Sequence, residues 1–191
     1  MAGTLPLSLV VITRDAAKEL AECLASGAFA SDVVVVDAGS RDDTVEIARR
    51  SGARVAVEPW RGFGPQKTFA VGMAAHDWVL CLDADGRLTP ELAQAIGALF
   101  SSGPPAQPAY AVARRNRFLG RWPAHGEGYP DWNVRLFDRR RARWTDDPVL
   151  EHVVADGTVG RLAGDLLYAS AESIEDYVAK YLSHGHVANP G

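Results

Sequence analysis

Cysteine is scarce in this sequence of 191 residues, which contains only Cys23 and Cys81. Two cysteines cannot build the disulfide framework of a small secreted domain. Both lie in apolar stretches typical of buried thiols, so we expect a reducing, cytoplasmic setting. The first residues lack the basic region and long apolar run of a signal peptide. No run reaches the roughly 18 apolar residues that span a bilayer.

Positive charge is not in excess either: 20 basic residues face 24 acidic ones, a formal net charge of -4. No overall positive field exists to attract nucleic acid, so we expect no nucleic-acid partner. The hydrophobic fraction of 47% and the charged fraction of 23% are average for globular proteins. They exclude a disordered chain, a collagen and a coiled coil. The length suits a single domain spanning residues 1–191.

Nucleotide-binding signatures rich in glycine are also absent. The turn that follows the first apolar run, Thr13 to Ala17, contains no glycine, so the dinucleotide fingerprint fails. The sequence contains no Gly-x-x-x-x-Gly-Lys-Ser/Thr run, which excludes a P-loop NTPase.

What the first hundred residues do contain is an alternation of β-branched runs and helical stretches. The predicted strands are 7–12, 33–36, 54–57 and 78–82. The predicted helix starts are Asp15 and Ser40 as caps and Pro65 and Pro90 in first turns. This pattern predicts parallel βαβ units, hence an α/β sheet with helices on both faces.

The second half has a different character. Residues 110–113 and 134–137 are predicted strands, and 153–162 is a predicted hairpin that turns at Asp156-Gly157. This half therefore predicts mixed or antiparallel structure added to the parallel sheet. A last helix is predicted from Ser173, and the lack of a clear terminal element after it suggests a truncated chain.

Acidic residues stand where two predicted strands end. Asp83 and Asp85 follow one strand, and two carboxylates at this spacing suit Mg²⁺ or Mn²⁺ if substrate phosphates complete the shell. Asp37 ends another strand, where it suits ribose hydroxyls or a base N–H, with Gly39 and Ser40 following. The alternatives remain open: an Asp-rich turn at Asp83 to Gly86, and a tight strand-to-helix turn with a capping serine after Asp37.

In this order the motifs resemble the family-2 glycosyltransferases of the GT-A fold, and more narrowly the small lipopolysaccharide-core β-glycosyltransferases of Gram-negative bacteria. The resemblance spans roughly residues 7 to 170. The matching runs include Val35-Val36-Asp37-Ala38-Gly39-Ser40, Gly62-Phe63-Gly64-Pro65-Gln66-Lys67, Leu80 through Asp85, and Tyr129-Pro130-Asp131. The resemblance implies a nucleotide-sugar half at about 7–100, an acceptor half at about 109–170 and a C-terminal helix at 173–191.

The resemblance implies a nucleotide-diphosphate sugar donor and a divalent cation, Mg²⁺ or Mn²⁺, bound by Asp83 and Asp85. The donor-binding candidates are Thr13, Arg14, Asp15, Asp37, Gly39, Ser40, Gly64, Gln66, Lys67, Asp83 and Ala84. The acceptor-binding candidates are Trp122, Tyr129, Trp132 and Arg135.

Inverting transfer also requires a general base for the acceptor hydroxyl. Asp131, Glu127 and Glu151 are the candidates, and the Tyr-Pro-Asp motif favours Asp131, with Glu151 as the second catalytic candidate. The alternative is that Asp131 merely pairs with Arg135, four residues later.

Two departures from the family pattern bear on activity. Asp15-Ala16 stands where the family has Asn-Glu, which puts a donor contact in doubt. Leu150 stands where the family has histidine, with His152 displaced by two positions.

Residues 114–143 hold nine arginines against three acids, a net charge of +6. They are expected to face an anionic glycolipid acceptor or the inner face of the membrane. A solvated loop is the alternative.

The sequence thus predicts an inverting hexosyltransferase, with UDP-glucose as the expected donor, that acts on a glycolipid of the lipopolysaccharide core or cell envelope. It would be cytoplasmic, with peripheral membrane contact as a further hypothesis. A nucleotidyltransferase and a catalytically impaired nucleotide-sugar-binding module are the alternatives.

Overall fold

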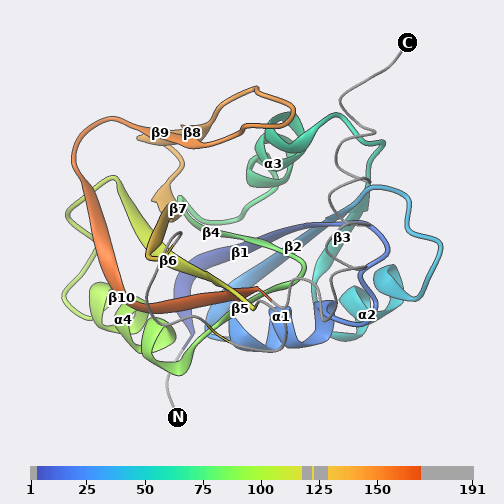
Figure 1. Ribbon diagram of the computed structural model, residues 1–191, viewed down its shortest axis with the longest axis horizontal. Helices are drawn as coiled ribbons and strands as arrows, with labels where there is room; N and C mark the ends of the chain where they lie inside the picture. Colours follow the sequence, from blue (N-terminus) through green and yellow to red (C-terminus); the bar gives the residue numbers. More distant parts are fainter. Residues whose placement is uncertain (1–3, 118–121, 123–128, 169–191) are drawn as a thin grey trace.

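The computed structural model describes residues 4–117, 122 and 129–168. Its main sheet has eight strands in the order β3-β2-β1-β4-β7-β6-β10-β5, and β8 pairs with β9 in a second sheet (Figure 1). The strands are β1 (Leu5–Thr13), β2 (Ala30–Asp37), β3 (Arg54–Val57), β4 (Trp78–Asp83), β5 (Gly86–Leu88), β6 (Ala109–Asn116), β7 (Asp131–Asp138), β8 (Ala142–Trp144), β9 (Val153–Ala155) and β10 (Val159–Tyr168). The helices are α1 (Leu20–Ser26), α2 (Thr44–Arg50), α3 (Phe63–Gly72) and α4 (Pro90–Phe100).

Strands β3, β2, β1 and β4 are parallel, which confirms the predicted βαβ units. Strand β1 is a nearly continuous apolar run because both of its faces are buried. Leu7, Leu9 and Val11 join the core on one face of the sheet, and Val10 and Ile12 join the core on the other. All five are at most 7% exposed. A strand covered on both faces has no polar side.

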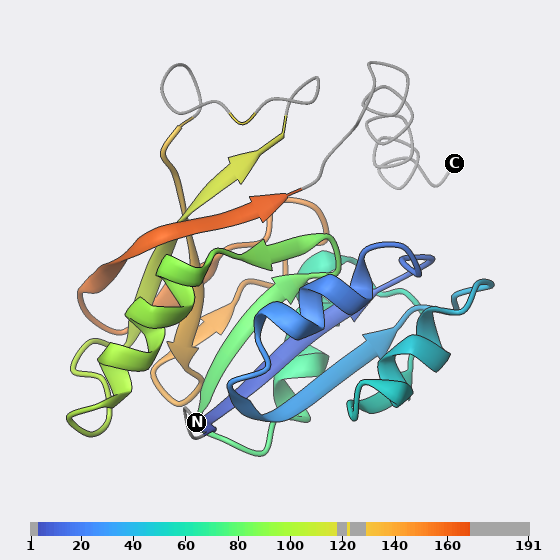
Figure 2. The ribbon, with the colours of Figure 1, turned by 90° about the horizontal axis from the view of Figure 1, so that it is seen from below.

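Helices α1, α2 and α4 cover one face of the sheet, and α3 together with the β8–β9 sheet covers the other (Figures 1 and 2). Cys23 on α1 and Cys81 on β4 are both buried, as their apolar surroundings predict. None of the helices in the described part of the chain is long and apolar enough to cross a bilayer.

The second half is mixed, as predicted. Strand β7 is antiparallel to β4 and β6, and β10 is parallel to β6 and antiparallel to β5. The predicted hairpin at 153–162 is wrong, because β9 pairs with β8 whereas β10 pairs with β6. The two strands diverge because each buries apolar residues in a different core. Leu162 and Leu166 of β10 pack with the α1–α4 side, and Val153 of β9 packs with the α3 side.

Two predicted helix starts are also wrong. Helix α1 begins at Leu20, not just after Asp15, whose φ of 48° lies in the left-handed region. Helix α2 begins at Thr44, and Ser40 does not cap it. The side chains of Asp15 and Ser40 instead accept hydrogen bonds that join two loops, as described below.

The two proline predictions are confirmed. Pro65 lies in the first turn of α3, and Pro90 is the first residue of α4, which Thr89 caps by accepting a hydrogen bond from the Leu92 N–H. The helix predicted from Ser173 falls outside the described residues.

Candidate active site

The carboxyl ends of neighbouring parallel strands meet at one edge of the sheet. In the strand register, Thr13 of β1 lies beside Asp37 of β2, and Ile12 of β1 lies beside Asp83 of β4. The two predicted acids therefore lie at the same edge, on either side of β1. The Thr13 hydroxyl oxygen is buried there and has no hydrogen-bond partner among the described residues. In open α/β sheets this edge is where ligands bind.

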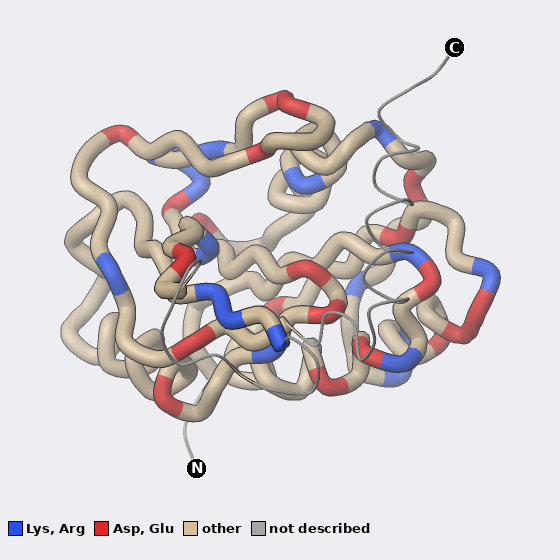
Figure 3. The backbone as a smooth tube through the Cα atoms, viewed as in Figure 1, with Lys and Arg blue, Asp and Glu red and all other residues tan. Residues whose placement is uncertain are grey.

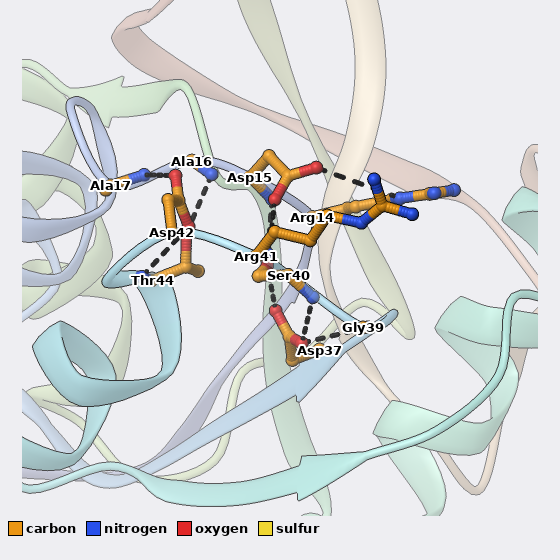
Figure 4. Close-up of polar contacts among 10 residues, drawn as sticks. All are labelled: Arg14, Asp15, Ala16, Ala17, Asp37, Gly39, Ser40, Arg41, Asp42 and Thr44. Atoms are coloured by element: carbon orange, nitrogen blue, oxygen red, sulfur yellow. Dashed lines mark hydrogen bonds and ion pairs between the residues drawn. The ribbon is translucent and has the colours of Figure 1, made fainter.

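Asp37 is held by its own loop (Figure 4). One carboxylate oxygen accepts the backbone N–H groups of Gly39 at 2.9 Å and Ser40 at 2.8 Å, and the other accepts the Ser40 hydroxyl. Gly39 has a φ of 86°, which a side chain rarely permits. Asp37 is only 1% exposed. The carboxylate thus fixes the backbone of a tight turn at the sheet edge.

The loop after β1 is tied to the loop after β2 (Figure 4). The Asp15 N–H donates to Ser40 Oγ at 2.8 Å, and Asp15 Oδ1 accepts the Arg41 N–H at 2.7 Å. The Ala16 N–H donates to the Thr44 hydroxyl at 2.8 Å. Asp15 and Ala16, which depart from the family pattern, thus serve to join two loops. Arg14 has an exposed side chain, 4.0 Å from the Asp15 carboxylate.

Asp83 is held by side chains from distant elements. Lys67 Nζ lies 3.1 Å from Asp83 Oδ1, and Arg135 Nη2 lies 3.3 Å from Oδ2. The Tyr168 hydroxyl donates to Oδ2 at 2.9 Å. Burial raises the pKa of the Asp83 carboxyl, but the charges of Arg135 and Lys67 more than offset this and hold the pKa well below its usual range. Asp83 is therefore ionised at every physiological pH.

Lys67 joins Asp83 to a segment on the other side of the site. Its ammonium lies 2.6 Å from Glu151 Oε1, across 84 residues of sequence. Its side chain is 5% exposed and lies over the Trp144 ring, with Nζ 4.5 Å from the ring centroid. The Arg135 guanidinium lies over the same ring at 5.6 Å. Trp144, on β8, thus covers two buried cations.

The glycines of the Gly-Phe-Gly-Pro-Gln-Lys run seat the segment that carries Glu151. The Phe63 and Gly64 N–H groups donate to the carbonyl oxygens of Pro148 and Asp147, at 2.9 and 3.1 Å. A Cβ on Gly64 would lie 2.2 Å from the Thr145 carbonyl oxygen. Only glycine fits this contact, which the sequence did not reveal.

Gln66, a donor-binding candidate, is fully buried, and its side-chain amide donates to the Glu58 carbonyl oxygen at 3.3 Å. This contact joins α3 to the segment that follows β3. Leu150 and His152, the two positions that concern the family's histidine, lie apart from the contacts among Asp83, Lys67 and Glu151. Leu150 is 77% exposed, and the exposed His152 is hydrogen-bonded back to Thr145.

Asp131 lies at the start of β7, beside an open pocket of about 430 Å³. Asp131 pairs with Arg114 at 2.8 Å, so the expected alternative, a pair with Arg135, is wrong. The register explains this, because Arg114 of β6 lies directly opposite Asp131. The pocket lining is Arg114, Asn116, Tyr129, Pro130 and Asp131.

A chain of contacts links this pocket to Asp83. The Tyr168 hydroxyl binds Asp83, and the Arg114 guanidinium lies 5.7 Å from the centroid of the Tyr168 ring. Arg114 in turn pairs with Asp131. The predicted donor and acceptor residues are therefore neighbours in space, although Asp83 and Asp131 are far apart in sequence.

The remaining acceptor candidates differ in placement. Tyr129 lines the pocket, and its hydroxyl donates to Asp165 at 2.7 Å. Trp132 follows Asp131 on β7 and therefore faces the other side of the strand, where the Arg161 guanidinium lies 4.8 Å from its ring centroid. Trp122 is half-buried, between segments outside the described residues, which include Glu127.

The described arginines of 114–143 do not form one patch. Arg114 and Arg115 lie at the site end of β7, where they pair with Asp131 and Asp165. Arg139 and Arg140 follow the far end of β7 and contact the start of β4 through Asp77. Lys and Arg are accordingly spread over several parts of the molecule (Figure 3).

Carboxylate oxygens at the end of β4 have the donor chemistry that Mg²⁺ and Mn²⁺ prefer. Within residues 4–117, 122 and 129–168, however, no three His, Cys, Asp or Glu side chains converge closely enough to hold a metal ion. The two carboxylates of Asp83 and Asp85 are thus fewer than the ligands that either cation requires, and a bound ligand would have to supply the others.

The arrangement of strands and helices is that of GT-A glycosyltransferases. Staphylococcus aureus TarS (residues 1–349) superimposes with a TM-score of 0.60 at 16% identity, over 92% of this chain and 63% of that chain. TarS 1–349 in complex with UDP-GlcNAc matches with a TM-score of 0.51 at 23% identity, over 63% of this chain and 37% of that chain. The predicted GT-A α/β fold is confirmed.

Sequence comparison narrows this class to one family. Residues 8–157 match the sequence model of glycosyl transferase family 2, and the chain belongs to that family. An uncharacterized glycosyltransferase of Rickettsia typhi is 33% identical over 91% of this chain and 63% of its own length. The lipopolysaccharide core biosynthesis glycosyltransferase LpsC of Rhizobium meliloti is 29% identical over 94% of this chain and 69% of its own length. The chain thus spans only part of these relatives.

Proposed function

We propose that the chain catalyses inverting transfer of a hexose from a nucleotide-diphosphate sugar to a glycolipid of the lipopolysaccharide core or cell envelope. UDP-glucose is the expected donor. The observation that carries the proposal is the chain of contacts from Asp83 through Tyr168 and Arg114 to Asp131. It joins a strand edge suited to a diphosphate to a pocket suited to an acceptor. Family membership, the UDP-GlcNAc bound to TarS and the name of LpsC support the same class of reaction.

At the donor edge, Lys67 and Arg135 supply buried positive charge beside Asp83. Charge of this sign stabilises a diphosphate leaving group as its negative charge develops. Asp83 and Asp85 would hold a divalent cation, which supplies further positive charge to the diphosphate when bound. The Thr13 hydroxyl and two Arg135 nitrogens, Nε and Nη1, are buried polar atoms without a hydrogen-bond partner in the described part of the chain, and a ligand would satisfy them.

At the acceptor pocket, Asp131 is the proposed general base. It takes the proton of the acceptor hydroxyl while that oxygen bonds to the anomeric carbon of the sugar. The bond from this carbon to the diphosphate breaks, and its electron pair leaves with the nucleoside diphosphate. Both acids are paired with a cation, but Asp131 is favoured because it lines an open pocket and its side chain is 36% exposed, whereas that of Glu151 is 14% exposed.

The acceptor is expected to be anionic, because Arg114 and Arg115 lie on β6 at this end of the sheet and Arg117 follows directly after the strand. Buried Nε atoms of all three have no hydrogen-bond partner among the described residues. Action on such a glycolipid would take place in the cytoplasm at the inner face of the membrane. Arg139 and Arg140, at the far end of β7, do not belong to this acceptor site.

The test is a transfer assay with radiolabelled UDP-glucose and a purified inner-core glycolipid, in the presence of Mn²⁺. We expect Asp131→Asn to lower kcat by about 10²- to 10⁴-fold, the usual contribution of a general base, without weakening UDP binding. A greater loss in Glu151→Gln than in Asp131→Asn would move the base to Glu151. UDP binding without transfer or donor hydrolysis would favour a binding module. Release of pyrophosphate from UTP and a sugar phosphate would favour a nucleotidyltransferase.

A further inference from the structure

Lys67 occupies the space between two carboxylates that come from different parts of the chain. Its ammonium lies 3.1 Å from Asp83 Oδ1 and 2.6 Å from Glu151 Oε1. The side chain is 5% exposed, and the Trp144 ring covers the ammonium. A buried ammonium requires compensating partners, and here it receives two acids and an aromatic face.

A divalent cation at Asp83 would compete for the same oxygen atoms. Oδ2 of Asp83 is engaged by Arg135 and Tyr168, and Oδ1 is engaged by Lys67. Arg135 is a rigid planar group on β7, in the middle of the sheet. Lys67 carries a point charge on a flexible stem of four carbons, so it is the partner that can move.

We propose that Lys67 is an exchangeable internal counter-ion of the donor site. Before the donor binds, the ammonium pairs with both Asp83 and Glu151. When a nucleoside diphosphate and a divalent cation bind, the ammonium leaves Asp83 and pairs with the diphosphate. This proposal rests on the proposed donor function of the site.

The exchange couples the two ligands. A divalent cation alone must displace Lys67 with no new partner for the ammonium, so the bare protein binds the cation weakly. The diphosphate supplies that partner, and each ligand therefore raises the affinity for the other by the same factor. The charges of Asp83, Glu151, Lys67 and Arg135 sum to zero, so the site is neutral before either ligand arrives apart from the Asp85 carboxylate.

The first test observes Lys67 directly in the unmodified protein. The sequence has only three lysines, Lys18, Lys67 and Lys180, so protein labelled with ¹³C at lysine Cε gives few signals. Lys67→Arg assigns one of them. We expect the Lys67 signal to shift when UDP and diamagnetic Mg²⁺ are both present, and the signal of exposed Lys18 to stay in place. An unshifted Lys67 signal in protein that binds UDP and Mg²⁺ overturns the proposal.

The second test measures Mn²⁺ binding by electron paramagnetic resonance without nucleotide. Lys67→Met should bind Mn²⁺ at least tenfold more tightly than the parent, because the competing ammonium is gone. Lys18→Met removes the same charge from an exposed position and should bind Mn²⁺ as the parent does. Equal or weaker Mn²⁺ binding by folded Lys67→Met contradicts the proposal. If this variant does not fold, the shift of the Lys67 signal in the unmodified protein decides whether the ammonium exchanges.

The two proposals fail in different ways. If UDP binds to the parent neither with nor without Mg²⁺, the proposed donor function fails and the exchange fails with it. If UDP and Mg²⁺ bind together while Lys67 stays on Asp83, only the exchange fails.

Discussion

The Asp37 carboxylate is held by residues two and three positions away in the sequence, whereas the Asp83 carboxylate is held by residues 16, 52 and 85 positions away. They end the two strands that flank β1, at the same edge of one sheet. The Asp37 carboxylate accepts backbone N–H groups and shapes a turn. The Asp83 carboxylate pairs with two buried cationic side chains, those of Lys67 and Arg135. Cationic groups of this kind also bind diphosphates. Two acids at one sheet edge are thus held in different ways, Asp37 by its own loop and Asp83 by several distant elements.

The largest expected effect follows from Asp83→Asn. The substitution removes the carboxylate that pairs with the buried Arg135 and leaves the buried Lys67 with Glu151 as its carboxylate partner. We expect a loss of about 3–5 kcal/mol in the free energy of unfolding, the usual cost of breaking a buried pair, measured by urea denaturation. If the free energy of unfolding falls by less than about 1 kcal/mol, Asp83 contributes no more to stability than Asp37 is expected to, and the proposed difference between the two acids is wrong.

Low pH should destabilise the unmodified protein in part as Asp83→Asn does, because it protonates the Asp83 carboxylate. The folded pKa of Asp83 lies below the pKa of about 4 that an unfolded chain gives aspartate. The stability from its pairing is therefore fully present above about pH 4 and is lost as the pH falls toward the folded pKa. Denaturation at a series of pH values should show the parent and Asp83→Asn converging in acid. A constant difference would contradict the assignment.

Gly64→Ala comes next in expected size. The new Cβ would meet backbone oxygen of Thr145 at 2.2 Å and of Asp147 at 2.5 Å. We expect destabilisation of about 1–3 kcal/mol, because the segment that carries Glu151 must shift. Gly72→Ala, in the same helix, meets nothing within 4 Å and serves as the control. It should stabilise the protein slightly, by about 0.4–1 kcal/mol.

Asp37→Asn should have the smallest effect. Asparagine keeps one oxygen that can accept the N–H groups of Gly39 and Ser40, and it loses only the acceptor of the Ser40 hydroxyl. We expect a loss of about 1 kcal/mol by urea denaturation. A loss as large as that of Asp83→Asn would mean that the Asp37 turn carries more than local structure.

The sequence predicted most of the parallel half, because β1, β2 and β4 are continuous apolar runs and Pro65 and Pro90 mark helix starts. It also placed Asp37 and Asp83 at one edge. It missed the helix starts near Asp15 and Ser40, because their side chains bind across two loops instead of capping.

Contacts between distant segments explain the other errors. The pairing of β9 with β8, the ion pair of Asp131 with Arg114, and the link from Lys67 to Glu151 all depend on tertiary packing. No spacing in the sequence encodes these partners. Gly64 did carry a signal, a glycine beside a helix start, but only the structure shows that its missing side chain admits the backbone of Thr145.

The most direct test of the proposed donor site is a crystal structure with UDP and Mn²⁺, in which anomalous scattering locates the metal. We expect the manganese peak at the turn after β4, within coordination distance of Asp83 or Asp85, and the diphosphate within hydrogen-bond distance of Lys67 Nζ. A nucleotide or manganese bound away from the carboxyl ends of β1, β2 and β4 would contradict it.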